Sequence, residues 1–256
     1  LVMPYYNEAG YIAPTLHSIA QQTDRRFQLI LVNNASTDES EQLARKACQS
    51  MTDIAVQFLN ENQPGKIFAL RTGLAEAGTA YVATLDADTI YPPDYVARIL
   101  REFAAGEGVA AVLAFDHPAG VEGLQATSRQ RLFADYFPSK CHTGGFGQAF
   151  DRAMLEECGG FDPDLWPYVL EDHEIIHRIG KLGSLAYAPD HICAPSDRRS
   201  DRSDCSWTTF ERIAYKLMPA ARMDWFFYSF LTKGFERRGL RNIKLRDQAW
   251  LKSNPA

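Results

Sequence analysis

Short apolar runs alternate along the first part of the chain with segments whose apolar residues recur every three or four positions. Short apolar runs are typical of buried strands, and they lie within LVMPYYNE and at residues 27–33, 55–60, 81–85 and 109–115. Helical spacing follows the strands, at residues 12–20, 36–47, 65–77 and 92–104. This alternation predicts an α/β fold with a mainly parallel sheet flanked by helices on both faces.

Two local signals mark where predicted helices begin. Ser36 and Glu39 in STDE form a capping-box signature for the second helix, and Pro92 and Pro93 suit the first turn of the helix before residue 104. The predicted strands themselves end in polar or turn-forming residues, in MPYYNE, VNNASTD, LNENQPGK and LDADT. Ligands of such sheets bind beyond the carboxyl ends of the strands, so we expect these four segments to share one crevice.

Two carboxylates, Asp86 and Asp88, directly follow the apolar run YVATL. At this spacing they can jointly hold a divalent cation that also binds a diphosphate, because Mg²⁺ takes few protein oxygens and completes its shell with water and phosphate. Such a cation would offset the charge on a leaving diphosphate. The alternative is structural: Asp88 or Thr89 merely caps the helix that starts near Pro92.

The order of several weak motifs is more specific than any one of them. PYYNE, NNASTD, NQPGKIFALRTG, LDADT, GGFGQAF and LEDHEIIHRI follow one another along the chain. In this order the sequence resembles the family 2 inverting glycosyltransferases with the GT-A fold, over roughly residues 1–195. The resemblance implies a Rossmann-like GT-A catalytic domain over 1–204 and a helical extension over 205–256. It also implies a hexosyltransferase of cell-envelope polysaccharide synthesis, which moves a sugar from a nucleoside diphosphate donor to a hydroxyl with inversion.

The resemblance places the donor at specific residues. It implies that the P-x-x-N-E loop lines the nucleoside pocket, that Lys66 and Arg71 lie near the base and diphosphate, and that a glycine pair lies under the donor sugar. Asn33 stands where the family usually has an acid that accepts a hydrogen bond from the base, which leaves the base less defined. The implied donor-binding residues are Pro4, Tyr5, Asn7, Glu8, Asn33, Lys66, Arg71, Asp86, Ala87, Gly144 and Gly145.

The resemblance also implies the catalytic groups and their cofactor. Asp88 corresponds to the direct ligand of Mg²⁺ or Mn²⁺, and Asp86 lies closer to the ribose and the metal. Asp172 corresponds to the base that takes the proton of the acceptor hydroxyl, with Glu171 as the second choice. The structural alternative for both acids is that they favour the first turn of any helix. The implied partners are a UDP-sugar and a saccharide or lipid-linked acceptor, with no nucleic acid.

Other functions compete for the same residues. HEIIH at residues 173–177 matches the H-E-x-x-H pattern of zinc peptidases, although no third ligand follows at a known spacing. The alternative is that Glu174 and Arg178 pair along the helix while His173 and His177 line the acceptor cleft. A non-catalytic module that binds sugar nucleotides also fits the motifs. A dehalogenase-type phosphatase fits poorly, since Ile90 stands at the fifth motif position.

Charge is distributed unevenly along the chain. The net charge of −5 combines −11 over residues 1–206 with +6 over residues 207–256. This asymmetry indicates that the tail meets an anionic surface, or that a basic helix packs on its own acidic domain. Arg198, Arg199 and Arg202 either close over the diphosphate or belong to a solvated linker.

The tail also carries clustered aromatic residues, Trp225, Phe226, Phe227, Tyr228, Phe230 and Phe235, followed by Lys233, Arg237, Arg238 and Arg241. This composition suits a helix in a membrane interface, and the alternative is that the aromatics complete a core. No apolar run reaches the length of a membrane span, and five scattered cysteines argue for reduced thiols. We therefore expect a cytoplasmic protein, at the inner face of the membrane if the tail binds lipid.

Overall fold

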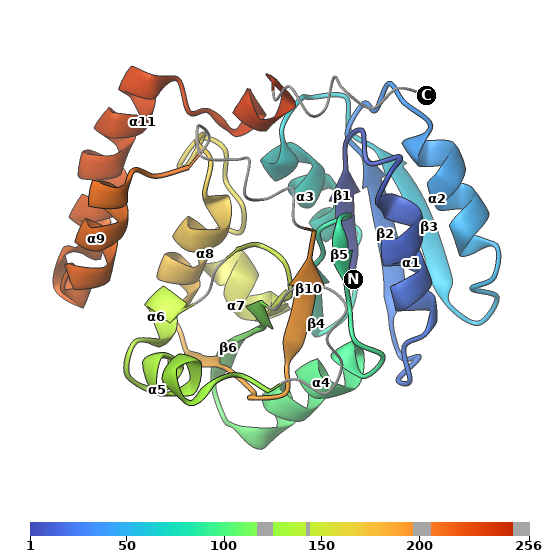
Figure 1. Ribbon diagram of the computed structural model, residues 1–256, viewed down its shortest axis with the longest axis horizontal. Coiled ribbons are helices and arrows are strands. Elements are labelled where there is room, and N and C mark those ends of the chain that lie inside the picture. Colours follow the sequence, from blue (N-terminus) through green and yellow to red (C-terminus); the bar gives the residue numbers. More distant parts are fainter. Residues whose placement is uncertain (117–124, 142–143, 197–205, 248–256) are drawn as a thin grey trace.

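The structure is a computed structural model that describes residues 1–116, 125–141, 144–196 and 206–247. Its main sheet has seven strands in the order β3-β2-β1-β4-β8-β6-β9 (Figure 1). β8 runs antiparallel to its two neighbours, and the other pairs are parallel. The strands are β1 Val2–Tyr5, β2 Gln28–Asn33, β3 Ala55–Asn60, β4 Tyr81–Thr84, β6 Val109–Leu113, β8 Gln148–Asp151 and β9 Ser184–Ala186.

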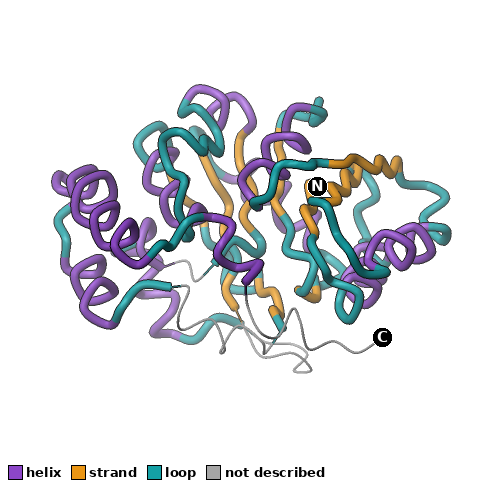
Figure 2. The backbone as a smooth tube through the Cα atoms, turned by 90° about the horizontal axis from the view of Figure 1, so that it is seen from above, coloured by secondary structure: helices purple, strands orange, loops and turns teal. Residues whose placement is uncertain are grey.

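Helices cover both faces of this sheet, as Figure 2 shows from above. Side chains alternate between the faces along a strand, so Met3 of β1 packs in the cluster with α1, α2 and α4, while Val2 packs in the cluster with α3, α7 and α8. The first group comprises α1 Ile12–Ala20, α2 Ser40–Cys48 and α4 Tyr95–Ala105. The second comprises α3 Lys66–Ala75, α7 Arg152–Glu157 and α8 Glu171–Ile179.

The predicted α/β alternation is confirmed, with three corrections. Pro92 and Pro93 do not lie in the first turn of a helix, because α4 begins at Tyr95. The apolar run 109–115 is not one strand: β6 ends at Leu113, and β7 Phe115–Asp116 joins a second sheet with β5 Thr89–Ile90 and β10 Ile192–Pro195. The capping box at Ser36 and Glu39 is wrong, because α2 begins at Ser40 without a side-chain cap from Glu39. The Ser36 hydroxyl instead accepts a hydrogen bond from the backbone N–H of Asn7 at 3.2 Å.

The C-terminal helices form a separate aromatic layer beside α8, at the left in Figure 1. Phe226, Phe227 and Phe235 are fully buried there against Trp166 and Tyr168. The core alternative for the tail aromatics is therefore confirmed for these three residues. The helical segments of this layer are α9 Thr209–Leu217, η2 Ala220–Arg222, α10 Met223–Trp225, η3 Phe226–Leu231 and α11 Thr232–Arg238. The last segment, η4 Asn242–Asp247, lies against α3.

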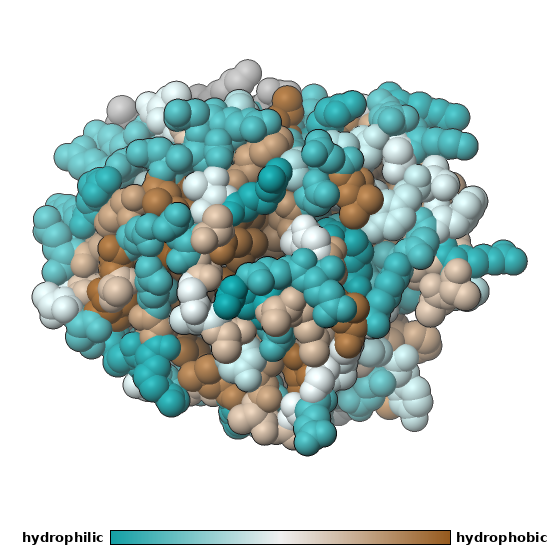
Figure 3. Space-filling model, turned by 180° about the vertical axis from the view of Figure 1, so that it is seen from behind, coloured by the Kyte–Doolittle hydropathy of each residue, from teal (hydrophilic) through white to brown (hydrophobic). Residues whose placement is uncertain are grey.

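Two short helices, α5 Ser128–Tyr136 and α6 Pro138–Cys141, adjoin the end of α9. The Tyr215 hydroxyl of α9 donates to the Ser139 carbonyl at 2.6 Å. On the face opposite to that of Figure 1, hydrophobic residues surface between hydrophilic ones (Figure 3). Within the described ranges, none of the helices has the length and apolar character needed to cross a membrane.

Candidate functional site

Lys66, Asp86 and Glu171 meet although they are far apart in the sequence. Lys66 opens α3, Asp86 follows β4, and Glu171 opens α8. The Lys66 Nζ atom lies 2.6 Å from Asp86 Oδ1 and 3.6 Å from Glu171 Oε1. Burial opposes the charge of Lys66, but the carboxylates of Asp86 and Glu171 outweigh it, so the pKa of Lys66 is raised. The structure therefore joins the two predicted acidic motifs through one cation.

The glycine pair passes directly beside this cluster. A Cβ atom on Gly145 would lie 3.1 Å from Lys66 Nζ and 3.4 Å from Asp172 Cβ. A side chain at Gly145 would therefore displace the ammonium or the acid, which explains why the backbone here approaches without one. Gly144 precedes it in the same turn, before β8.

Asp172 is held by its neighbours at the start of α8. Its Oδ1 atom accepts a hydrogen bond from the backbone N–H of His173 at 2.9 Å and lies 3.0 Å from the His173 ring Nδ1. The Gln148 amide donates to the Asp172 carbonyl at 3.2 Å. The helix is entered through Leu170 at φ 64°, a left-handed conformation that costs a branched residue about 1–2 kcal/mol. Burial raises the pKa of Glu171, against the opposing effect of Lys66.

Asp88 is buried and hydrogen-bonded to Ser196, the residue that follows β10. Ser196 donates to Asp88 twice, from its hydroxyl to Oδ2 at 2.9 Å and from its backbone N–H to the carbonyl at 2.9 Å. The alternative that Asp88 or Thr89 caps a helix is wrong, because α4 begins at Tyr95 and its N-cap position is Asp94.

Side chains of Thr15 and Tyr91 hold the backbone between Asp86 and Asp88 through hydrogen bonds. The Ala87 carbonyl accepts from the Thr15 hydroxyl of α1 at 2.9 Å, and the Asp86 N–H donates to the Tyr91 hydroxyl at 2.8 Å. Tyr91 and the adjoining Tyr95 are fully buried. Asp86 and Asp88 therefore sit on a rigid, apolar floor.

The donor set at Asp86 and Asp88 fits a divalent cation that shares its shell with phosphate. It offers two carboxylates, and in the described part of the chain no three His, Cys, Asp or Glu side chains gather as a metal cage. Mg²⁺ commonly binds one or two carboxylates together with substrate phosphates. The residues present therefore suit a metal that arrives with a diphosphate.

The predicted nucleoside loop lies at the ends of β1 and β2. Pro4 and Tyr5 are buried in β1, and burial, followed by the charge of Glu41, raises the pKa of the Tyr5 hydroxyl. Asn7 takes a φ of 53°, and its amide oxygen accepts from the Thr37 N–H at 2.8 Å. The Glu8 N–H donates to the Ser40 hydroxyl at 2.6 Å. These bonds tie the first loop to the start of α2.

Both the nitrogen and the oxygen of the Asn33 side-chain amide make hydrogen bonds within the protein. Its Nδ2 donates to Glu41 Oε2 at 2.5 Å, and its Oδ1 accepts from the Ser36 N–H at 2.9 Å. A carboxylate therefore does lie at the end of β2, but it belongs to Glu41 of α2 and not to residue 33. The hydrogen bond from Arg45, and then that from Asn33, lowers the pKa of Glu41.

Some predicted site residues lie apart from the cluster. Arg71 is exposed on α3, and none of the hydrogen bonds or ion pairs observed among the described residues connects it to the carboxylates. Arg198, Arg199 and Arg202 lie outside the described residues.

HEIIH does not form a zinc-like arrangement. Glu174 is buried in an ion pair with Arg178, at 2.6 Å from Oε1 to Nε, which confirms the predicted helical pair. The His177 Nε2 atom lies 2.7 Å from Asp224 Oδ1, and its ring stacks on Phe227. His173 faces the rings of Trp207 and Tyr215. His173 and His177 are therefore packed against the C-terminal layer, and the hypothesis that they line an acceptor cleft stays a prediction.

Two residues that adjoin the site could not be predicted from the sequence. Ser196 lies in a segment considered only for its arginines, and a serine carries no signal of its own there. Arg246, in η4, places its guanidinium 3.8 Å from the centre of the Tyr6 ring and donates to the Asn34 carbonyl at 2.6 Å. No pattern links residue 246 to residue 6, because their contact arises only when the C-terminal segment folds across α3.

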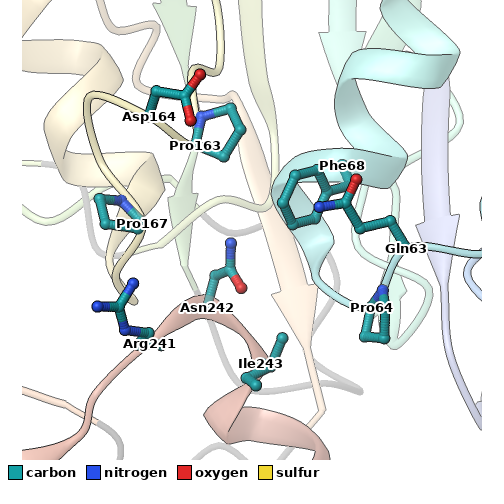
Figure 4. Close-up of a pocket in the computed structure, with 9 residues that line it drawn as sticks. All are labelled: Gln63, Pro64, Phe68, Pro163, Asp164, Pro167, Arg241, Asn242 and Ile243. Carbon is teal, nitrogen blue, oxygen red and sulfur yellow. The ribbon is translucent and has the colours of Figure 1, made fainter.

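A pocket of about 420 Å³ lies next to the cluster, between the loop before α3, the segment around Pro163 and the start of η4. Figure 4 shows Phe68, Pro167 and Asn242 around its interior. None of the predicted site residues lines it. The pocket is therefore adjacent to the acidic cluster and distinct from it.

Comparison of the sequence with known proteins gives a consistent result. The sequence model of the family described as "Glycosyl transferase family 2" matches residues 1–159. The teichoic acid poly(glycerol phosphate) polymerase of Staphylococcus epidermidis is 30% identical over 147 residues, which are 57% of this chain and 20% of that protein. The undecaprenyl-phosphate 4-deoxy-4-formamido-L-arabinose transferase of Pseudomonas syringae is 27% identical over 116 residues, 44% of this chain and 34% of that protein. The chain thus spans only a minor part of the length of these two relatives.

Solved structures share the fold. Mannosyltransferase PcManGT from Pyrobaculum calidifontis, in complex with GDP-Man and Mn²⁺, gives a TM-score of 0.67 at 23% identity and covers 88% of this chain and 68% of that chain. TarS of S. aureus in complex with UDP-GlcNAc gives a TM-score of 0.61 at 15% identity. The match covers 98% of this chain and 76% of that chain. The neighbours are GT-A enzymes, so the predicted GT-A fold is confirmed.

Proposed function

The chain belongs to glycosyl transferase family 2 and is a glycosyltransferase, and we propose that it moves a sugar from a nucleoside diphosphate to an acceptor hydroxyl with inversion. The observation that carries this proposal is the ion cluster in which Lys66 Nζ contacts both Asp86 and Glu171. It brings the acids after β4 and the acids that open α8 to the same place. A sugar bound between them has a diphosphate group on one side and a carboxylate on the other.

Asp172 is the base in this proposal. The acceptor oxygen attacks the anomeric carbon from the face opposite the diphosphate, and its proton passes to the Asp172 carboxylate. The bond between the anomeric carbon and the phosphate oxygen breaks, and its electron pair leaves with the nucleoside diphosphate. His173 positions the base, because its backbone N–H and its ring both contact Asp172 Oδ1. Glu171 is less suited, since it is paired with Lys66.

Asp88 and Asp86 would hold Mg²⁺ or Mn²⁺ together with the diphosphate, and the bound cation supplies positive charge that offsets the charge of the leaving group. Lys66 adds a second positive charge at the same point. The absence of a side chain at Gly145 lets Lys66 and Asp172 approach the backbone there. Asn33, Asn7, Glu8 and Tyr5 shape the nucleoside end, where Arg71 is the least supported of the expected residues.

The donor is proposed to be a UDP-sugar and the acceptor a saccharide or a lipid-linked hydroxyl. The neighbouring structures hold UDP-GlcNAc and GDP-Man, so a pyrimidine and a purine nucleotide are both found in this fold. The name of one relative includes undecaprenyl-phosphate, which supports a lipid-linked acceptor here.

The test is a panel of nucleotide sugars scored for thermal stabilisation with Mn²⁺ and for release of nucleoside diphosphate. We expect one donor to stabilise the protein and to be turned over, with the anomeric configuration inverted in the product. Asp172→Asn should bind that donor as the wild type does and lose about 1,000-fold in turnover, within the range for removal of a general base. Asp135→Asn, at an exposed position of α5, is the matched control.

Two outcomes would contradict the proposal. A donor that binds but is never turned over with any acceptor would indicate a non-catalytic sugar-nucleotide-binding module. Retention of the anomeric configuration would exclude the single displacement, since one attack from the opposite face inverts that carbon.

A further inference from the structure

The outward face of α9 is apolar, which is the reverse of an ordinary surface helix. Phe210, Ile213 and Leu217 are 70%, 52% and 76% exposed. Their spacing of three and four residues places them on one side of the helix. The opposite side carries Glu211 and Tyr215, which are buried against the rest of the layer.

This apolar face continues beyond α9. The ring of Phe230 lies 6.3 Å from that of Phe210 and stacks on Trp225 at 5.7 Å. Trp225 is itself 53% exposed. The five residues Phe210, Ile213, Leu217, Trp225 and Phe230 therefore form one surface, called the α9 patch below.

Cations surround the α9 patch. Exposed basic residues lie on α9 and on the helices after it, at Arg212, Lys216, Arg222, Lys233 and Arg237. The acids of α9, α10 and α11 are engaged: Glu211 pairs with Arg238, Asp224 contacts both His177 and Lys181, and Glu236 accepts a hydrogen bond from the Tyr168 hydroxyl. The surface around the patch is therefore positive, in agreement with the net charge of +6 over residues 207–256.

The charge favours a lipid surface over a second copy of the chain. A symmetric dimer through the α9 patch would place two positive surfaces against each other. An anionic bilayer instead attracts the basic rim while its acyl region accepts the aromatic and aliphatic side chains.

We propose that the α9 patch docks on an anionic membrane surface. Phe210, Ile213, Leu217 and Trp225 insert at the headgroup level, and Arg212 and Lys216 contact the lipid phosphates. This inference rests on the proposed function in one respect: it gives the acceptor a location. Trp207 and Tyr215 of the same layer contact His173, which contacts Asp172. An acceptor carried in the bilayer would therefore meet the same C-terminal layer that contacts His173 beside the proposed base.

The test is sedimentation of the 256-residue chain with vesicles of phosphatidylcholine, with and without phosphatidylglycerol. We expect binding to the anionic vesicles that weakens as salt is raised. The triple variant Phe210→Ser, Ile213→Ser and Leu217→Ser should lose about tenfold or more of this binding. Arg212→Gln with Lys216→Gln should lose about fivefold for each charge removed. Leu165→Ser, at an exposed leucine outside the patch, should bind like the wild type.

A second measurement keeps this inference separate from the proposed function. Binding of vesicles should shift the fluorescence of the wild type to shorter wavelength, and Trp225→Phe should remove most of that shift. Donor turnover with a water-soluble acceptor, measured without vesicles, should be the same in the triple variant and the wild type. Loss of turnover in every sample with vesicle binding intact would contradict the proposed function alone.

Three results would overturn the membrane proposal. The wild type does not bind anionic vesicles, the triple variant binds as well as the wild type, or the wild type is a dimer in solution that the triple variant converts to monomers. The last result would identify a second copy of the chain as the occupant of the patch.

Discussion

The proposed donor side and the proposed acceptor side of the site are held in different ways. The donor side lies at the ends of β1, β2 and β4, and short loops tie it down, such as the bonds between Asn7 and Thr37. The acceptor side lies at the start of α8, and helices from residues 207–240 hold it through His173 and His177. The donor side is therefore a product of the sheet itself, whereas the acceptor side depends on long-range packing of a second layer.

Backbone strain marks the loops of both sides. The non-glycine residues with positive φ in the described chain are Asn7, Ala35 and Leu170. Two follow the strands of the donor side, and one opens the helix of the acceptor side. Strain of this kind persists only where the surroundings fix it, as the hydrogen bond from the Thr37 N–H fixes Asn7.

The largest expected effect comes from breaking the support of the acceptor side. Phe227 is fully buried and stacks on the His177 ring at 5.1 Å. Phe227→Ala should lower the free energy of unfolding by about 3–5 kcal/mol, because it leaves a cavity in the aromatic layer. Denaturant unfolding measures this, with Phe210→Ala as the exposed control, which should change it by less than about 0.5 kcal/mol. A loss below about 1 kcal/mol for Phe227→Ala would show that the layer does not depend on its core.

The second-largest effect should be a loss of turnover when the cation site of the donor side is removed. Asp88→Asn should reduce turnover by about 100-fold or more, because the charge of the leaving diphosphate is then poorly offset. Removal of divalent ions with EDTA should do the same to the wild type, and Mn²⁺ should restore it. Initial rates of nucleoside diphosphate release measure both effects. Full activity in EDTA would show that Lys66 alone supports the leaving group.

The apolar floor beneath the donor side predicts a pH dependence of stability. Burial lowers the pKa of His191 to about 3, from an ordinary value of 6.5, so the folded state keeps this ring neutral while the unfolded state takes up a proton. Stability should fall as the pH drops from 6.5 toward 3, by about 1.4 kcal/mol per pH unit from this group. His191→Phe, which keeps the stacking on Tyr95, should flatten that slope, whereas His17→Gln should not. If the free energy of unfolding had the same pH dependence in the wild type and in His191→Phe, His191 would not be the source of that dependence.

A smaller effect on turnover should separate the two sides most cleanly. His173→Phe keeps a ring between Trp207 and Tyr215 but loses the contact of Nδ1 with Asp172. Turnover should fall about tenfold, equivalent to one charge-assisted hydrogen bond, with donor affinity unchanged. His173→Asn, whose amide can donate in the same place, should recover part of the loss. A weaker donor affinity in His173→Phe would mean that the two sides are not independent.

The smallest effect concerns strain on the donor side. Ala35 is exposed at φ 59°, and glycine adopts this conformation without the steric cost. Ala35→Gly should raise the free energy of unfolding by about 0.5 kcal/mol, after the entropy of glycine is subtracted. Ala97→Gly within α4 should lower it by about 1 kcal/mol. Thermal unfolding of the two variants measures both effects. If Ala35→Gly also destabilised the protein, Ala35 would not be strained.

The sequence was informative where structure is local. The apolar runs at 27–33 and 55–60 became β2 and β3, because short apolar runs are typical of strands. β2 is buried inside the sheet, whereas β3 lies at its edge and is half-buried. Asp86 and Lys66 could be placed together because both follow strands whose ends meet at one edge of the sheet.

Long-range contacts set the limit of that reasoning. The Ser36 hydroxyl is bonded to the Asn7 backbone, which no pattern within STDE can indicate. The two histidines of HEIIH face the C-terminal layer because Trp207 and Asp224 fold onto α8 from far along the chain. Nothing in the sequence distinguishes the aromatic residues of the tail from one another, yet Phe226 is buried and Trp225 is exposed. Only the packing of the layer decides which side of each helical turn faces inward.

A crystal structure of the Asp172→Asn variant with its nucleotide sugar and Mg²⁺ tests the central claim most directly. The account predicts the ion within about 2.1 Å of an Asp88 oxygen and of the diphosphate. It also predicts the anomeric carbon between the diphosphate and residue 172, with space for an acceptor oxygen about 3–3.5 Å from that carbon. A sugar that points away from residue 172, or a nucleotide bound in the pocket around Phe68 and Asn242, would contradict it.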